Sequence, residues 1–250
     1  MIPLRSYWAD SRSPRYSLLF ALPLLVVYEL LAALLAPAAG GVRNGADVLL
    51  RSAFALVAGR WAPVALGAVV VGAALGLVVR DLRGRGGLRA AVRPRIFLVM
   101  LAESAALALV FGAVVAAVTS ALLHPTLVLA QGAEPAPLAT FSWPQRLMLS
   151  VGAGLYEELL FRVVLVSGLM LLAHHVAGLS QRAAGAVAVV AGAALFSAAH
   201  YVGAYGDPFT LESFTFRFVA GLFFSALYVL RGFGITAWTH ALYDAFLLVL

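Results

Sequence analysis

The sequence contains no cysteine and no lysine, so all 17 of its basic residues are arginines. Without cysteine the chain can form neither a disulfide nor a zinc–thiolate site, and it cannot use a thiol as a nucleophile. Charged residues make up only 11% of the chain and hydrophobic residues 63%, whereas an ordinary soluble domain is about 25% charged. So few charges exclude a soluble enzyme, a coiled coil and a disordered chain. The class that remains is a polytopic membrane protein, whose apolar exterior is solvated by lipid.

Apolar runs long enough to cross the hydrocarbon core, which takes about 20 residues, follow one another along the chain. They predict an all-α transmembrane bundle of about seven spans, with six to eight as the limits, in a single membrane domain over residues 1–250. A further helix at 47–60 is expected to be interfacial or partly inserted, and 124–144 and 203–212 are expected to be loops. The predicted spans are 17–39, 62–79, 96–123, 145–173, 183–200, 214–230 and 233–250.

The arginines are concentrated beside the spans. The segment 80–95 holds six arginines against one acidic residue, Asp81, and three more arginines precede the first span. Because basic residues are retained on the cytoplasmic side, this pattern predicts a cytoplasmic N-terminus. A net charge of +6 is often a sign of nucleic-acid binding, but here it is better explained by membrane orientation, and we expect no nucleic-acid partner.

The densest group of ionisable residues inside an apolar span is Glu157-Glu158-Leu159-Leu160-Phe161-Arg162. Glu158 and Arg162 are four residues apart, so they share a helix face and are expected to form an ion pair. Glu157 projects about 100° away from that face and lacks this partner. Charged groups at membrane depth are costly and usually functional, so Glu157 is a candidate general base.

Two further spans carry histidines. His200 ends the fifth predicted span, and His240 lies four residues before Asp244 in the last one. A carboxylate at this spacing can accept the imidazole N–H and fix its tautomer. Two kinds of site are compatible with these residues: a water activated by Glu157 and His200 with an oxyanion stabilised near His240, or a zinc site made from Glu157, His200, His240 and Asp244. The spacing does not decide between no cofactor and a divalent metal such as zinc.

At these positions the chain resembles the CPBP family of intramembrane proteases, which includes the type II CAAX prenyl proteases and bacteriocin-processing, abortive-infection-like proteins. The family motifs Glu-Glu-x-x-x-Arg and Phe-x-x-x-His match residues 157–162 and 196–200. The third motif, His-x-x-x-Asn, matches 240–244 except that Asp244 stands where the family usually has Asn. We assign residues 145–250 to the protease-motif core.

The resemblance implies an intramembrane endopeptidase in the bacterial inner (plasma) membrane. Its substrate is expected to be a membrane-anchored protein or peptide, with the lipid bilayer as its surroundings, rather than a prenylated CAAX protein. The implied roles are water activation by Glu157 and His200, an oxyanion or ligand position for His240 and Asp244, and structural support from Glu158 and Arg162.

Two alternatives belong to other functional classes. One is a non-catalytic membrane scaffold or immunity factor with the same fold, and the other is a small proton-coupled transporter that uses Glu157 and the histidines as a relay. Retention of Glu157, His200 and His240 favours the enzyme over the scaffold. The chain shows no internal repeat, which a transporter would favour. Two other acidic residues in apolar spans, Glu29 and Glu103, are expected to pair with arginines of other elements.

Overall fold

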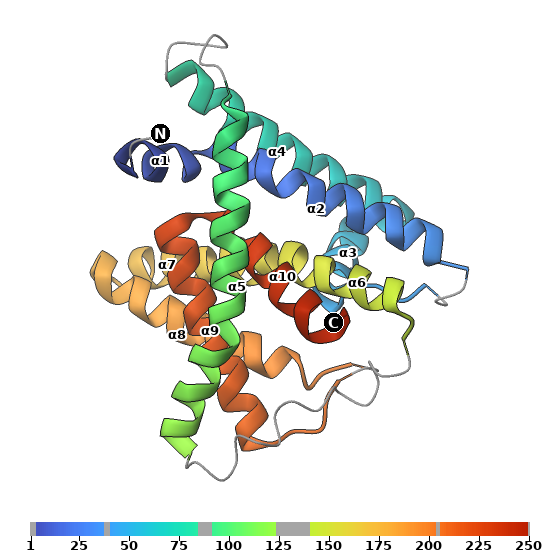
Figure 1. Ribbon diagram of the computed structural model, residues 1–250, viewed down its shortest axis with the longest axis vertical. Coiled ribbons are helices and arrows are strands. Elements are labelled where there is room, and N and C mark those ends of the chain that lie inside the picture. The colour runs from blue at the N-terminus through green and yellow to red at the C-terminus, as the bar shows by residue number, and fades with distance from the viewer. Residues whose placement is uncertain (1–3, 38–40, 85–91, 124–140, 204–205, 250) are drawn as a thin grey trace.

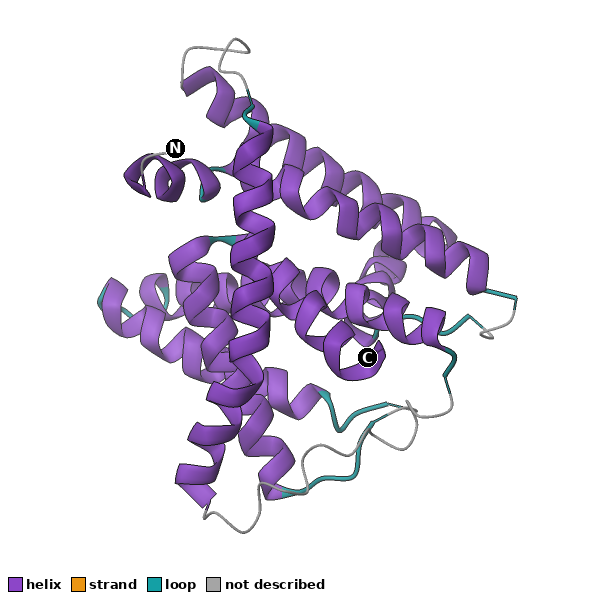
Figure 2. Cartoon of the chain, viewed as in Figure 1, coloured by secondary structure: helices purple, strands orange, loops and turns teal. Residues whose placement is uncertain are grey.

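The computed structural model describes residues 4–37, 41–84, 92–123, 141–203 and 206–249, and within these ranges every regular element is a helix (Figures 1 and 2). The helices are α1 (Leu4–Ser11), α2 (Pro14–Leu35), α3 (Gly45–Ala58), η1 (Gly59–Trp61), α4 (Ala62–Gly84), α5 (Pro94–Leu123), α6 (Trp143–Gly152), η4 (Ala153–Glu157), η5 (Leu159–Val166), α7 (Ser167–His175), α8 (Gln181–Ala199), α9 (Leu211–Arg231) and α10 (Phe233–Val249).

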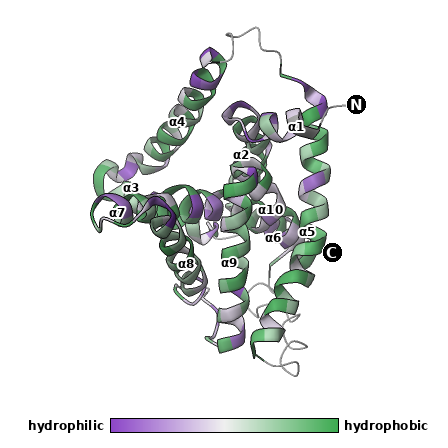
Figure 3. Ribbon diagram, turned by 90° about the vertical axis from the view of Figure 1, so that its left-hand side faces the viewer, coloured by the Kyte–Doolittle hydropathy of each residue, from purple (hydrophilic) through white to green (hydrophobic). Residues whose placement is uncertain are grey.

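Five helical segments in the described part of the chain have the length and hydropathy of membrane spans. They are Pro14–Leu35, Gly45–Gly84, Pro94–Leu123, Gln181–Ala199 and Leu211–Arg231. Large apolar side chains such as Leu98 and Leu109 of α5 are exposed along them, and Figure 3 shows α4 and α5 as largely hydrophobic ribbons. Because an apolar exterior of this extent is stable only against lipid, the fold is a helical membrane bundle of about seven spans, as predicted.

The other two predicted spans lie partly inside the bundle. One is the helical rod formed by α6, η4, η5 and α7, and the other is α10, whose 17 residues are about 25 Å long, a little short of the roughly 30 Å hydrocarbon core. Helix α10 contacts α2, α5, α6, η4 and α9, and Figure 1 shows it behind α5. Its residues Ile235, Ala237 and Thr239 are fully buried. The parts of these two spans that carry candidate site residues are therefore shielded by protein, whereas α7 at the end of the rod has no buried residue.

Several helix boundaries differ from those predicted by two to five residues; for example, α2 begins at Pro14 rather than 17, and α9 begins at Leu211, within the predicted loop 203–212. Residues 124–140 of the predicted loop 124–144 lie outside the described part of the chain, but the remainder is not all loop, because α6 begins at Trp143 rather than at 145. Ser142 and Gln145 form a capping box, and Pro144 occupies the first turn, where a missing N–H costs nothing. The predicted helix 47–60 exists as α3, and it continues through η1 into α4.

The two isolated acidic residues pair with arginines, as expected. Glu103 of α5 binds Arg231 at the end of α9 through two contacts, Nε to Oε1 at 2.6 Å and Nη2 to Oε2 at 2.8 Å. Glu29 of α2 binds Arg43 and Arg51 at 2.7 and 2.8 Å. These pairs neutralise carboxylates within the bundle, and the Glu103–Arg231 pair connects two helices that are distant in the sequence.

Gly154 sets the distance between η4 and α10. A Cβ atom at this position would lie 2.3 Å from the carbonyl oxygen of Ala237 and 2.6 Å from the Cβ of Ala241. Both contacts are far inside van der Waals distance, and the first is with backbone. The absence of a side chain at 154 therefore allows η4 and α10 to touch one turn away from Glu157 and next to His240.

We expect Gly154→Ala to lower the folded yield of the protein strongly, because the added methyl group must push α10 away. Gly168→Ala is the matched control, since a Cβ at Gly168 meets nothing within 4 Å and alanine favours a helix over glycine by about 1 kcal/mol. The measurement is the yield of monodisperse protein in detergent and its thermal midpoint. Equal behaviour of the two variants would show that the helices do not meet as closely as described.

Candidate active site

Glu157 and Glu158 lie where the central rod changes its helical geometry. The π-helical segment η4 ends at Glu157, and a second π-helical segment, η5, begins at Leu159. Hydrogen bonds from i to i+5 widen the helix here, and such turns inside α-helices are frequent at functional sites. Both carboxylates therefore come from the widened part of the rod and face the interior of the bundle.

His200 follows the last turn of α8. Its Nδ1 atom is 2.8 Å from the carbonyl oxygen of Phe196. Because a carbonyl oxygen can only accept, the neutral imidazole carries its proton on Nδ1, and Nε2 is left as an acceptor. The Phe-x-x-x-His spacing thus sets the tautomer of His200 through the main chain.

The free nitrogen of His200 faces Glu157. Nε2 lies 4.0 Å from Oε2 of Glu157, and this oxygen is buried with no hydrogen-bond partner among the described residues. A buried acceptor without a partner costs about 1–3 kcal/mol. At this separation a water about 2.8 Å from both atoms would subtend an angle of roughly 90° at its oxygen. The pair has the geometry of a two-acceptor water site.

Glu158 joins two residues of the motifs. Its Oε2 lies 3.1 Å from Nε of Arg162, which confirms the predicted pair. Its Oε1 also accepts a hydrogen bond of 2.7 Å from Nδ1 of His240, a contact that the sequence did not predict. Glu158 is 0% exposed and Arg162 1% exposed, so this group of charges is enclosed by protein.

Asp244 lies on the other side of the His240 ring. Its Oδ2 is 3.6 Å from Nε2, which is longer than a hydrogen bond. Since Nδ1 donates to Glu158, the contact at Nε2 is attractive only if a proton is present on Nε2 or on Asp244. The orientation of the imidazole is thus held by Glu158, and Asp244 faces the edge that can carry a donor.

Phe196 connects the two halves of the site. The guanidinium of Arg162 lies 4.4 Å from the centroid of the Phe196 ring, a cation–π contact. The ring centroids of His200 and His240 lie 4.9 and 6.3 Å from the same ring. The phenylalanine of the second motif therefore contacts the arginine of the first motif and lies near both imidazoles.

All six predicted site residues come together in one place, as two joined units. The first unit is Glu157 with His200. The second is Glu158 with its two partners, Arg162 and His240, and Asp244, which contacts His240. The units are joined because the two glutamates are consecutive in the chain.

Asn44 is a further residue at this site, and the sequence pattern did not indicate it. This residue caps α3, is 6% exposed and donates from Nδ2 to Oε1 of Glu157 over 2.9 Å. An asparagine ahead of an apolar run is a recognisable helix start. Nothing in the spacing, however, connects it to a glutamate 113 residues away.

A zinc site is the alternative to a metal-free site. Zinc in proteins takes at least three ligands from side chains. The described residues include no group of three or more histidines, aspartates or glutamates arranged to hold a metal ion. Glu157 and His200 offer two donor atoms. Nδ1 of His240 is already bound to Glu158, and its Nε2 faces Asp244 at 3.6 Å. In this arrangement the four candidate ligands do not fit zinc.

Comparison with protein-family models gives a match for the second half of the chain. Residues 139–246 match a family model described as type II CAAX prenyl endopeptidase Rce1-like. The match includes all three motifs and confirms the resemblance to the CPBP intramembrane proteases. Neither a curated protein nor a solved structure matches the chain.

The two glutamates are expected to differ in their effect on folding. Glu158→Gln leaves the buried Arg162 without an anionic partner, and breaking a buried pair in this way costs about 3–5 kcal/mol, so folded yield and thermal midpoint should fall. Glu157→Gln removes no partner of an arginine and keeps the acceptor for Asn44, so both quantities should stay near wild type. The measurement is size-exclusion yield and thermal unfolding in detergent. Equal losses in the two variants would contradict this division.

Proposed function

Because residues 139–246 carry a domain of the Rce1-like type II CAAX prenyl endopeptidase family, we propose that this membrane protein is an intramembrane endopeptidase. Glu157 and His200 activate a water that attacks the peptide bond of a membrane-associated substrate. The observation that supports the proposal most directly is the buried, unpartnered Oε2 of Glu157, 4.0 Å from Nε2 of His200.

The two acceptors orient the water. One O–H donates to the carboxylate of Glu157 and the other to Nε2 of His200, so the oxygen lone pairs point away from both side chains toward the substrate carbonyl. As the oxygen bonds to the carbonyl carbon, its proton passes to Glu157. The same proton then moves to the amide nitrogen as the C–N bond breaks. The products are a carboxylic acid and an amine, and Glu157 is restored as a carboxylate.

The second unit stabilises the negative charge that develops on the substrate carbonyl oxygen. Glu158 accepts a hydrogen bond of 2.7 Å from Nδ1 of His240. The other ring nitrogen, Nε2, is left 3.6 Å from Asp244, and we propose that the substrate carbonyl oxygen binds beside these two groups. A proton on either group donates to the oxyanion in surroundings that exclude water, where such a bond is strongest. Arg162 neutralises the carboxylate of Glu158. Glu158 can therefore hold His240 in place without leaving an unpaired charge in the interior.

The substrate is proposed to be a membrane-anchored protein or peptide, since the site lies within a helical membrane bundle.

We further propose that residues 1–250 form one membrane domain with its protease-motif core at 145–250. The membrane is proposed to be the bacterial inner membrane, with the N-terminus in the cytoplasm. Because the chain lacks cysteine, a single cysteine introduced in the N-terminal tail can be tested with impermeant reagents, and labelling from outside would overturn that orientation.

Glu157→Gln and His200→Asn should each lower cleavage by about 100-fold or more, as loss of a positioned base does. His175→Asn is the control, because His175 lies at the exposed end of α7. The probes are an internally quenched peptide ending in a prenylated CAAX sequence and a single-span reporter protein, each in proteoliposomes. Wild-type activity in the Glu157 variant, or cleavage of neither probe by the wild type, would reject the proposed function.

Asp244→Asn tests the donor edge of His240. Since Glu158 already orients the imidazole, we expect the variant to keep its activity. A protonated Asp244 donates only while it holds its proton, so wild-type cleavage should fall as pH rises, whereas the amide donates at every pH and the variant's profile should stay flat. A loss of activity of about 10-fold or more across the pH range would instead show that ionised Asp244 either orients His240 or binds a metal ion. Profiles with and without a chelator separate these two roles.

A further inference from the structure

Asn44 reaches the candidate active site from outside the residues of the family match. It lies in the segment between α2 and α3, and its Nδ2 donates to Oε1 of Glu157 over 2.9 Å. The approach is close because Gly152 has no side chain; a Cβ there would lie 2.9 Å from the Cβ of Asn44. The N-terminal half of the chain therefore touches the proposed base directly.

The orientation of the Asn44 amide is determined by its other contacts. Oδ1 accepts from the backbone N–H of Ala46 at 2.9 Å, which caps α3. The backbone N–H of Asn44 itself donates to the hydroxyl of Tyr28 at 3.1 Å. Since Oδ1 is engaged at the cap, the donor end Nδ2 must face Glu157. Oε1 of that carboxylate is thereby occupied, and Oε2 is left facing His200.

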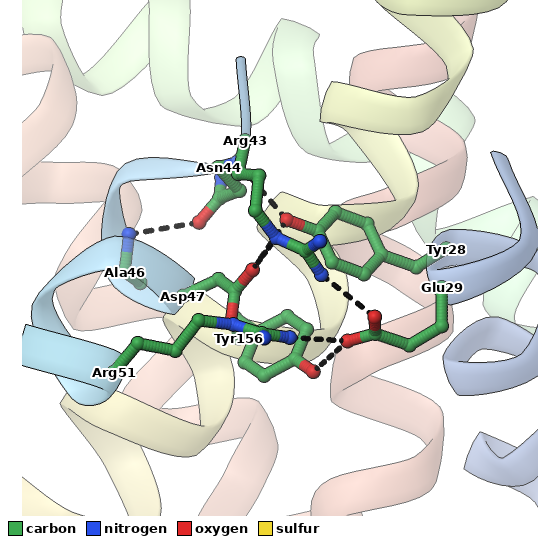
Figure 4. A network of polar contacts seen from close by, with 8 residues as sticks. All are labelled: Tyr28, Glu29, Arg43, Asn44, Ala46, Asp47, Arg51 and Tyr156. Carbon is green, nitrogen blue, oxygen red and sulfur yellow. Dashed lines mark hydrogen bonds and ion pairs between the residues drawn. The ribbon is translucent and has the colours of Figure 1, made fainter. Parts of the chain in front are cut away.

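A network of ions holds this segment in place (Figure 4). Arg43 and Arg51 each bind both Asp47 and Glu29, so two positive and two negative charges balance. Burial lowers the pKa of Arg43, but hydrogen bonds to Asp47 and Glu29 outweigh it and raise the pKa above the ordinary value. The arginine is therefore charged at any pH of interest.

Two tyrosines connect this network to neighbouring helices. The hydroxyl of Tyr28 in α2 donates to Asp47 at 2.9 Å. The hydroxyl of Tyr156 in η4 donates to Glu29 at 2.7 Å, and Tyr156 is the residue just before Glu157. The network thus binds α2, α3 and η4 together around Asn44, and it restricts the motion of both the donor and the acceptor of the Asn44–Glu157 bond.

We propose that Asn44 is a positioning residue for the proposed base: its amide fixes the carboxylate of Glu157 so that one oxygen stays free for the water shared with His200. This inference rests on the proposed function, since it assigns Asn44 to the reaction carried out by Glu157 and His200. It also implies that the protease core is completed by the segment before α3, which the three motifs do not include.

Two substitutions separate positioning from helix capping. Serine and aspartate are both good N-cap residues, so Asn44→Ser and Asn44→Asp retain the cap of α3. Serine is too short to reach Glu157, and aspartate replaces the donor by an acceptor. With the CAAX peptide and the single-span reporter as probes, we expect kcat to fall by about 10-fold or more in both, as for other orienting groups, with KM little changed. The Ser variant keeps the cap of α3 but leaves Oε1 of Glu157 without its donor, so its thermal midpoint should fall slightly, and less than that of Asn44→Asp.

A double variant tests the hydrogen bond without relying on cleavage. Asn44→Asp should lower the thermal midpoint at neutral pH, because two carboxylates then face each other. Adding Glu157→Gln reverses donor and acceptor, since the new amide can donate to the carboxylate at 44, and should restore the midpoint while cleavage stays absent. Thr210→Ala serves as the capping control, because Thr210 caps α9 by accepting from the N–H of Ser213.

The outcomes are distinguishable. Wild-type kcat in Asn44→Asp, together with loss of cleavage in Glu157→Gln, overturns the role of Asn44 and leaves the proposed function standing. Undiminished cleavage in Glu157→Gln overturns the proposed function itself, and the positioning role with it. A kcat loss in Asn44→Ser that is matched by an equal fall in midpoint, as in Thr210→Ala, would show a capping role only. A midpoint that the double variant does not restore would show that the two side chains are not bonded.

Discussion

The arrangement of the site depends on the buried carboxylate of Glu158. It lies between Arg162 on its own rod and His240 on α10, at 3.1 and 2.7 Å. An unpaired ion in this interior would cost several kcal/mol, so the arginine, the carboxylate and the imidazole can be buried only together. The rings of Phe196 and Phe224 cover the guanidinium at 4.4 and 5.4 Å. The rod, α8, α9 and α10 must therefore come together before any one of these charges is stabilised.

How far the sequence predicts the structure depends on the separation of the partners along the chain. The Glu158–Arg162 pair follows from helical spacing alone, and the lipid-exposed spans follow from composition, because both are local properties. The Glu158–His240 bond joins residues 82 positions apart and depends on how α10 is rotated against the rod. That rotation is set by packing at Gly154, where backbone meets backbone. A motif identifies the residues of a site, but the contacts between motifs follow from helix packing.

The N-terminal half illustrates the same limit more strongly. Composition and periodicity describe this half only as membrane helices. The family model matches residues 139–246 and so does not include residues 1–138. Yet this half contacts η4 beside the candidate base. The ion network around Glu29 and Asp47 binds Tyr156, and the amide of Asn44 binds Glu157 itself. Polar residues of this kind are spread over a turn and two helices, so no short pattern reveals them. Their relation to the candidate site follows only from the contacts that they make in the folded chain.

The two π-helical segments have a consequence for how this region can change over evolutionary time. A π-helical turn contains one residue more than the α-helical turn it interrupts, so it behaves as an insertion that the helix has absorbed. Deleting one residue between Ala153 and Val166 can therefore be absorbed by a return to α-helical geometry, which keeps the two ends of the rod in register. The side chains that would be redistributed are those of the widened part itself, which include Glu157 and Arg162. A change of length by one codon here would thus alter the site and spare the rest of the rod.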